Sequence, residues 1–174
     1  HDLVDSLYST RHQECLDVFE SIKATHPASN FLCECTMDDL STMDLAENLR
    51  KRATHVIKEQ ERVTSFCQGI KNDSDLSDLG QLLTQSHESS SQNFENSCEE
   101  LDFLVDLSKN LPQVVGSRMM GGGFGGCTIN LVEEGFVNEF MDLASKAYKQ
   151  KFDINLTSIL VATSNGVETV NSES

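Results

Sequence analysis

Apolar side chains recur along this chain at intervals that predict mostly helices and a few strands. Near the start, Leu16, Phe19 and Ile22 follow helical spacing, and the segment ends before Pro27. A longer stripe at the same spacing predicts a helix of about seven turns. Its members are Leu49, Ala53, Val56, Gln60, Val63, Cys67 and Ile70.

Three further helices follow from the same pattern. Thr36, with Asp38 and Asp39 behind it, is typical of a helix N-terminus. Leucines at 76, 79, 82 and 83 predict an amphipathic helix that begins after the polar residues 72–75 and fades at residues 89–91. Ser97 and Glu100 have capping-box spacing, which predicts a helix from there to about Leu107.

Strand-like segments appear in the last third of the chain. Residues 114–119 and 128–132 are apolar and β-prone, and a helix over 136–147 follows them. We expect another strand at 158–161, a turn at Asn165-Gly166, and a strand at 167–170 that pairs across it. Helices ahead of such a tail predict an α+β domain, with helices on one face of an antiparallel sheet.

Between the first two strands, five glycines occupy six positions: Gly121, Gly122, Gly123, Gly125 and Gly126 surround Phe124. Glycine reaches backbone conformations that other residues avoid and lets another group approach the main chain closely. One interpretation is a loop whose amides face phosphates or support a phosphate loop. The alternative is a flexible hairpin. The run fits neither the dinucleotide-binding fingerprint nor the Walker sequence.

Composition narrows the possible partners. With 174 residues and 38% hydrophobic content, the chain fits a single domain. Its net charge of −15 argues against binding to nucleic acid or to an anionic membrane surface, because both carry negative charge. No apolar run reaches the roughly 18 residues that would span a bilayer.

Cysteine and histidine spacing predicts no metal site. The six cysteines lack the density of a small disulfide framework, so we expect free thiols. Cys33 and Cys35 form a single C-x-C without a second pair of ligands. His55 and His87 are expected to be hydrogen-bonded helix residues and not acid–base catalysts.

The glycine-rich run from Gly116 to Val132 resembles the third conserved motif of the GHMP small-molecule kinases, and in particular of the branch that phosphorylates galactose. Residues 96–102 resemble the segment that precedes this motif. Residues 52–56 resemble the long middle helix of the family. Residues 1–11, with Cys15, are similar to the stretch that opens the C-terminal half. The resemblance therefore spans nearly the whole chain.

This resemblance implies a fold and a place in a longer protein. It implies the GHMP kinase C-terminal domain, a ferredoxin-like antiparallel sheet with helices mainly on one face, over residues 1–174, with a frayed tail at 171–174. The sugar signature, the ATP-phosphate loop and the catalytic aspartate of the family all lie upstream of the matched region. No catalytic residue or metal ligand is then expected here, and the segment alone is expected to be inactive.

The partners implied are galactose, Mg²⁺ and ATP, with the metal ligands in the N-terminal half, and that N-terminal domain itself. A cytoplasmic enzyme is implied as well. Two alternatives stay open. One is a kinase for N-acetylgalactosamine, and the other is a catalytically inactive relative that senses sugar or binds a partner.

Several residues acquire expected roles from the resemblance. Tyr8 matches a tyrosine that reaches the sugar, although a purely structural tyrosine is the alternative. Residues Gly121 to Gly126 would pack beside the ATP-phosphate loop. Arg118 would support that wall or approach phosphate, or else form a structural ion pair. His12 and Glu99 depart from the family pattern, which leaves any charge pairing at position 12 in doubt.

Overall fold

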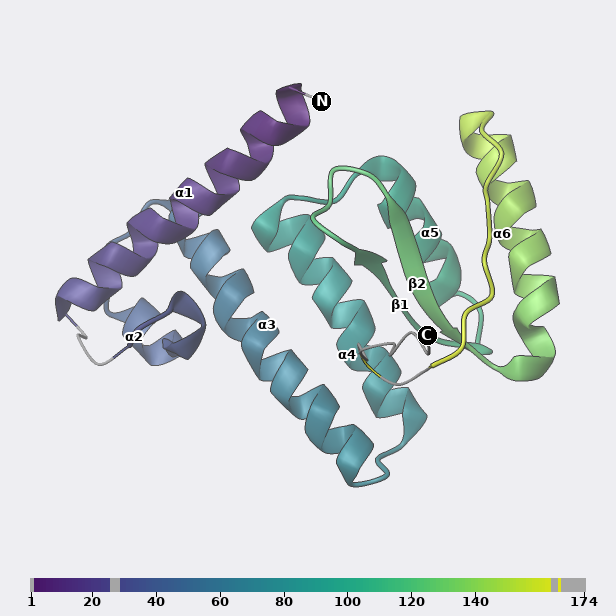
Figure 1. Cartoon of the computed structure of the whole chain (residues 1–174), viewed down its shortest axis with the longest axis horizontal. Coiled ribbons are helices and arrows are strands. Elements are labelled where there is room, and N and C mark those ends of the chain that lie inside the picture. Colours follow the sequence, from purple (N-terminus) through teal and green to yellow (C-terminus); the bar gives the residue numbers. More distant parts are fainter. Residues whose placement is uncertain (1, 26–28, 164–165, 167–174) are drawn as a thin grey trace, which may run out of the picture.

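A computed structural model describes residues 2–25, 29–163 and 166 of the chain. Helices dominate it, and one antiparallel hairpin forms its sheet (Figure 1). In chain order, the elements are α1 (Asp2–Thr25), η1 (Leu32–Glu34), α2 (Met37–Ser41), α3 (Glu47–Lys71), α4 (Leu76–Ser89), η2 (Ser90–Phe94), α5 (Glu99–Lys109), β1 (Val114–Met120), β2 (Cys127–Val132), η3 (Glu134–Phe136) and α6 (Val137–Phe152).

The first part of the chain forms a helical layer. Helix α1 crosses α3, and α2 packs beside α3, below α1 in the view of Figure 1. Thr36 and Asp39 form the capping box that starts α2, as the sequence predicts. The apolar side chains that the three helices and η1 share make a core. Its buried members are Val18, Ile22, Leu32, Cys35, Leu40, Ala53 and Ile57.

The second part is built around the hairpin. Strands β1 and β2 pair in antiparallel register, with Ser117 opposite Asn130. Ser117 is fully buried and donates a hydrogen bond to Asn130 Oδ1 over 2.6 Å. Ser108 of α5 lies against the same amide, so α5 covers this face of the sheet. Helix α4 packs along β1, and α6 packs on α5 at the far side (Figure 1).

The structure confirms the α+β class, the long helices and the first two strands, and it corrects one detail of the helices. The capping box predicted from Ser97 and Glu100 is wrong. Helix α5 starts after Cys98 without a side-chain cap, and Ser97 instead donates to Asp102 Oδ1 over 2.6 Å. Helix α4 ends at Ser89, within the predicted range, and the π-helical turn η2 follows it directly.

The strand predicted at 158–161 is also wrong. This segment has no regular secondary structure, and Ile159, Leu160 and Val161 are 79, 73 and 68% exposed. A strand needs a neighbour to satisfy its backbone, and no described segment pairs with this one. The expected partner strand at 167–170 and the expected frayed tail at 171–174 lie outside the described residues.

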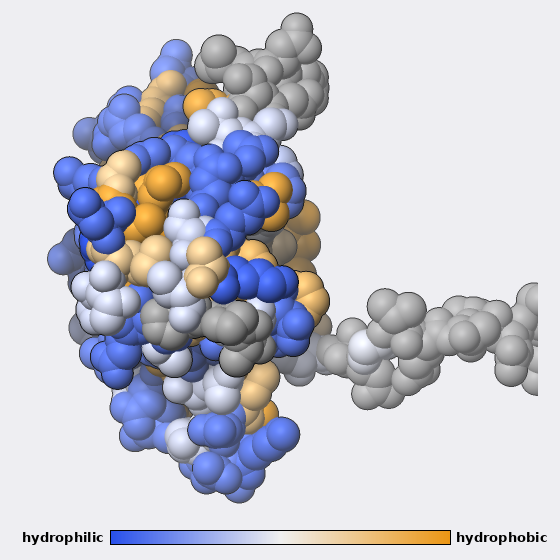
Figure 2. Space-filling view, turned by 90° about the vertical axis from the view of Figure 1, so that its left-hand side faces the viewer, coloured by the Kyte–Doolittle hydropathy of each residue, from blue (hydrophilic) through white to orange (hydrophobic). Residues whose placement is uncertain are grey.

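The apolar stripe of α3 is buried only over its first half. Ala53 and Ile57 belong to the core, but Val63 and Ile70 are about half exposed. Near its end, α3 contacts α4 through Gly69, where an added Cβ would lie 2.7 Å from Leu79. On the side that α1 and α2 cover, hydrophilic residues predominate and apolar ones form small groups (Figure 2). None of the described helices is long and apolar enough to cross a membrane.

Candidate functional site

The glycine-rich loop that joins β1 to β2 has a defined backbone shape. Gly121, Gly123, Gly125 and Gly126 have φ values of 79°, 87°, 130° and 105°. Phe124 also has a positive φ, of 58°. Side chains rarely tolerate this region, so the glycines are needed for the conformation itself. The glycine loop, residues 121–126, is therefore a shaped turn.

Asn96 holds this loop from the other side. The backbone N–H of Phe124 donates to the carbonyl oxygen of Asn96 over 2.6 Å. The side-chain amide of Asn96 donates to the carbonyl of Gly122 over 3.0 Å. A Cβ added to Gly123 would lie 2.1 Å from the Asn96 carbonyl oxygen, so only glycine fits at this contact.

Tyr8 lies beside the same loop. A Cβ at Gly122 would meet the edge of the Tyr8 ring at 3.7 Å, which is ordinary van der Waals contact. The tyrosine is 60% exposed, so its position leaves most of the side chain accessible. The start of α1 and the glycine loop, more than 110 residues apart in sequence, therefore form one surface (Figure 1).

Arg118 is held by an ion pair on the neighbouring helix. Its Nη1 lies 3.2 Å from Glu59 Oε1 of α3, and its Nε donates to the Met119 carbonyl. Glu59 also accepts a hydrogen bond from Ser86 of α4. Burial would raise the pKa of Glu59, but Ser86 and the two arginines it faces lower it below its usual range. Arg118 thus has the structural ion pair that sequence reasoning weighed against a phosphate contact.

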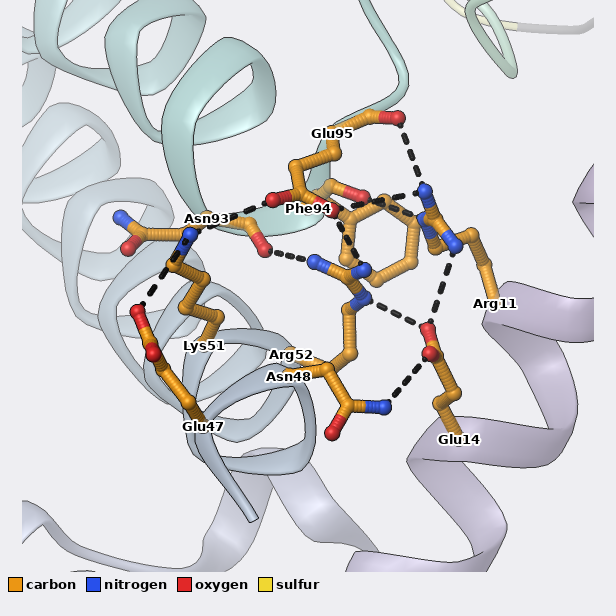
Figure 3. Close-up of polar contacts among 9 residues, drawn as sticks. All are labelled: Arg11, Glu14, Glu47, Asn48, Lys51, Arg52, Asn93, Phe94 and Glu95. Carbon is orange, nitrogen blue, oxygen red and sulfur yellow. Dashed lines mark hydrogen bonds and ion pairs between the residues drawn. The ribbon is translucent and has the colours of Figure 1, made fainter.

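A cluster of charges that the sequence did not indicate surrounds residues 93–95, which directly precede Asn96 in the chain (Figure 3). Its centre is Arg52 of α3, whose side chain is 2% exposed. Nε of Arg52 lies 2.6 Å from Oε2 of Glu14 on α1, and its Nη2 lies 2.7 Å from Oε2 of Glu95. It also donates to the carbonyl of Asn93 over 2.5 Å. We call Arg11, Glu14, Arg52 and Glu95 the charge cluster.

The carboxylates of the charge cluster are held in their ionised form. The hydrogen bond from Arg52 lowers the pKa of Glu95. Burial alone would raise the pKa of Glu14, but hydrogen bonds from Arg52 and Asn48, with the charges of Arg52 and Arg11, lower it overall. Each carboxylate is therefore paired with Arg52, whose buried charge needs such partners.

His55 and His87 are hydrogen-bonded helix residues, as the sequence predicts. The ring Nδ1 of His55 lies 3.0 Å from the Ser89 hydroxyl. Nδ1 of His87 accepts from the backbone N–H of Met119 over 3.2 Å, and its Nε2 lies 3.1 Å from Asp102 Oδ1. Burial lowers the pKa of both rings, to about 4 for His55. His87 therefore ties β1, which leads into the glycine loop, to α4 and α5.

The glycine loop has an accessible backbone. A Cβ at Gly121 or at Gly125 would meet no atom within 4 Å, so a phosphate group or another chain segment has room to approach the loop there. Among residues 2–25, 29–163 and 166, no three His, Cys, Asp or Glu side chains are arranged to hold a metal ion. The described cysteines are free thiols, and burial raises the pKa of Cys15 to about 11.

A depression of the described surface is lined by no residue of the glycine loop. It has a volume of about 480 Å³ between the start of α5 and the end of α6. Glu95, Glu99, Asp102 and Asp106 line it, together with Lys151. Since it is mostly acidic, it does not suit a phosphate-bearing ligand.

Comparisons with known proteins give this site a context. Residues 64–148 match the family model described as GHMP kinases C terminal. The galactokinase of Thermotoga petrophila is 39% identical over 170 residues, which is 98% of this chain and 46% of that protein. The galactokinase of Thermosipho africanus is 35% identical over 96% of this chain and 46% of its own length. The chain thus spans about half the length of these curated relatives.

A solved structure is similar as well. It is the crystal structure of Lactococcus lactis galactokinase complexed with galactose, which matches with a TM-score of 0.78 and 28% sequence identity. The match covers 86% of this chain and 39% of that one.

Proposed function

Because this chain contains a GHMP kinase C-terminal domain, we propose that its 174 residues form a single domain and make up the C-terminal half of a galactokinase. That enzyme would transfer the γ-phosphoryl group of Mg·ATP to the anomeric hydroxyl of α-D-galactose. The products would be galactose 1-phosphate and ADP. A cytoplasmic location belongs to the same proposal.

One observation carries the proposal. The resemblance assigns Tyr8 to the sugar and the glycine loop to the nucleotide, and the two lie next to each other, since a Cβ added at Gly122 would lie 3.7 Å from the Tyr8 ring. A residue that touches the sugar and a loop that supports the phosphates must lie close together, since the phosphoryl group passes between the two substrates. The similarity to galactokinases over 98% of this chain supports the same assignment.

Each of these parts has a simple chemical task. Tyr8 offers an accessible phenol hydroxyl for hydrogen bonding and a ring face for the apolar C–H surface of a sugar. The glycine loop would form a wall of the nucleotide site, where its open sides at Gly121 and Gly125 allow close approach. Arg118 stays a candidate for support of that wall through its ion pair with Glu59.

The chain would contribute positioning and not the reacting groups. When bound, Mg·ATP supplies the phosphoryl group and the charge that the metal neutralises. In this proposal the catalytic base and the metal ligands belong to the N-terminal half and not to this chain. Phosphoryl transfer depends mostly on positioning and electrostatic stabilisation. Such a half can therefore be required for turnover while being inactive alone.

The proposal is tested by ADP release. The longer enzyme is supplied with Mg·ATP and either galactose or N-acetylgalactosamine, and the 174-residue chain alone is run beside it. We expect turnover with galactose in the longer enzyme and none in the 174-residue chain. A preference for N-acetylgalactosamine would reassign the substrate. An absence of turnover with either sugar would favour an inactive, sugar-sensing relative.

A further inference from the structure

We propose that Asn96 is a positioning residue that latches the glycine loop, and that the charge cluster holds Asn96 in place. The inference deepens the proposed function and rests on it for the kinetic part of its test. It starts from the turn over residues 93–96, which joins the end of η2 to the start of α5.

This turn has an unusual backbone. Glu95 lies in the left-handed region, with φ 54° and ψ 44°. Residues with a side chain pay about 1–2 kcal/mol for that conformation. The turn also includes the last residues of the π-helical segment η2, where the carbonyl groups have no helical partners. It therefore needs contacts from outside to keep its shape.

Two arginines from different helices supply those contacts. Arg52 Nη1 donates to the carbonyl of Asn93 over 2.5 Å. Arg11 donates through Nε to the carbonyl of Phe94 over 2.7 Å and through Nη2 to that of Glu95 over 3.2 Å. Three consecutive carbonyls thus accept from guanidinium groups (Figure 3). Cations are favoured at such a helix C-terminus, where the carbonyl ends of the peptide dipoles collect.

The fourth carbonyl in the series is the latch. The backbone carbonyl oxygen of Asn96 accepts a hydrogen bond from Phe124 N–H. The side-chain Nδ2 of Asn96 donates one to the carbonyl of Gly122. Asn96 is 7% exposed, and its Oδ1 is buried without a hydrogen-bond partner among the described residues. Its side chain is therefore fixed to the loop through Nδ2. Four consecutive residues, 93–96, therefore connect the carbonyl that Arg52 binds to the glycine loop.

Two carboxylates hold the arginines in turn. Glu14 of α1 accepts from Arg52 over 2.6 Å and pairs with Arg11 at 3.3 Å. Glu95 pairs with both arginines, at 2.7 Å and 3.6 Å. Charge-assisted hydrogen bonds of this kind are stronger than neutral ones and have narrow geometry. The cluster therefore joins α1, which carries Tyr8, to the turn that carries Asn96.

Hydrogen–deuterium exchange of residues 121–126 in the longer enzyme tests the latch directly. Asn96→Ala removes the bond to Gly122 and should speed exchange of the loop amides about tenfold. Asn110→Ala is the matched control, because Asn110 also makes one side-chain bond to a backbone carbonyl, over 2.8 Å, but at the end of α5. Unchanged loop exchange in Asn96→Ala, or an equal effect of Asn110→Ala, would overturn the proposal.

A second pair of variants tests the charge cluster. Arg52→Lys keeps a positive charge but has no planar fork to reach Glu14, Glu95 and Asn93 together. We expect faster exchange of the same loop amides. Arg50→Lys, on the same helix and bonded to the carbonyls of Leu40 and Met43, should leave the loop unchanged. Protection of the loop that survives Arg52→Lys in a folded protein would contradict the role of the cluster.

Kinetics of the longer enzyme separate positioning from stability. Asn96→Ala should raise KM for ATP several-fold and leave KM for galactose within about twofold, because the latch fixes the nucleotide wall. A substitution that only destabilises the protein lowers the amount of active enzyme and changes neither KM. Equal KM values for wild type and variant would overturn the positioning role. Faster loop exchange in a protein that phosphorylates no galactose would refute the proposed function and leave the latch standing.

Discussion

Gly80 of α4 and Gly116 of β1 touch through their backbones. A Cβ added to Gly116 would lie 2.3 Å from the carbonyl oxygen of Gly80, and one added to Gly80 would lie 2.0 Å from that of Val115. Real Cβ atoms do not approach backbone atoms this closely. The helix therefore lies directly on the strand that leads into the glycine loop.

Gly80→Ala should destabilise the fold strongly. Since the obstructing atoms belong to the backbone of β1, α4 must move away, and we expect a loss of at least about 2 kcal/mol. Urea denaturation followed by circular dichroism measures it. Gly135→Ala is the control, because a Cβ at Gly135 would meet nothing within 4 Å. Equal stability of the two variants would argue against the backbone contact.

Two alanine substitutions within the glycine loop should differ. Gly121 and Gly123 both have positive φ, so alanine is strained at either position by about 1–2 kcal/mol. Only Gly123 also faces the Asn96 carbonyl, at 2.1 Å from an added Cβ. We expect Gly123→Ala to cost roughly 3 kcal/mol or more and Gly121→Ala to cost only the strain. Chemical denaturation of the pair would contradict this account if Gly121→Ala were the more damaging.

Tyr8→Phe tests the sugar contact in the longer enzyme. Loss of the phenol hydroxyl should raise KM for galactose by up to about tenfold, which is the value of one net hydrogen bond, and should leave KM for ATP unchanged. The chain has one other tyrosine, Tyr148, which packs against Phe152 of α6. Tyr148→Phe should change neither KM. If both variants bound galactose like the wild type, Tyr8 would have only structural contacts.

Acid should destabilise the fold through His55. Burial lowers its pKa from 6.5 to about 4, so the folded state favours the neutral ring. The resulting stability is fully present above pH 6.5 and is lost as the pH falls towards 4. At about 1.4 kcal/mol per pKa unit, the loss amounts to roughly 3 kcal/mol.

The pH dependence of His55→Gln isolates this contribution. His87 titrates in the same direction, because burial lowers its pKa as well, and it remains in the variant. The free energy of unfolding of His55→Gln should therefore fall less steeply between pH 6.5 and 4 than that of the wild type. Parallel curves would show that His55 is not buried as described.

Local patterns predicted the parts of this structure that local physics determines. Helical spacing identified α1, α3 and α6, and the clustered glycines identified a shaped loop. The strand predicted at residues 158–161 is wrong because β-propensity alone does not supply a neighbouring strand to pair with. The expected burial of Val63 and Ile70 was wrong, because spacing defines a helix face but does not show how much of that face a neighbouring element covers.

The contacts that organise the candidate site join distant residues. Arg52 and Asn93 are 41 positions apart, and Arg11 and Phe94 are 83 apart. Nothing in one sequence pairs an arginine with a particular carbonyl so far away. Arg52 did carry a weak signal, since it lies three residues after Leu49 and four before Val56, where a charged residue on the apolar face of a helix requires a partner.

Phosphorus NMR of the reaction product tests the central proposal most directly. The longer enzyme that contains this chain would be incubated with Mg·ATP and galactose, and the product phosphate observed for coupling to the anomeric proton. A galactokinase would give a single sugar phosphate coupled to that proton, with an equal amount of ADP. A phosphate on another hydroxyl, or no sugar phosphate from a folded protein, would contradict the assignment.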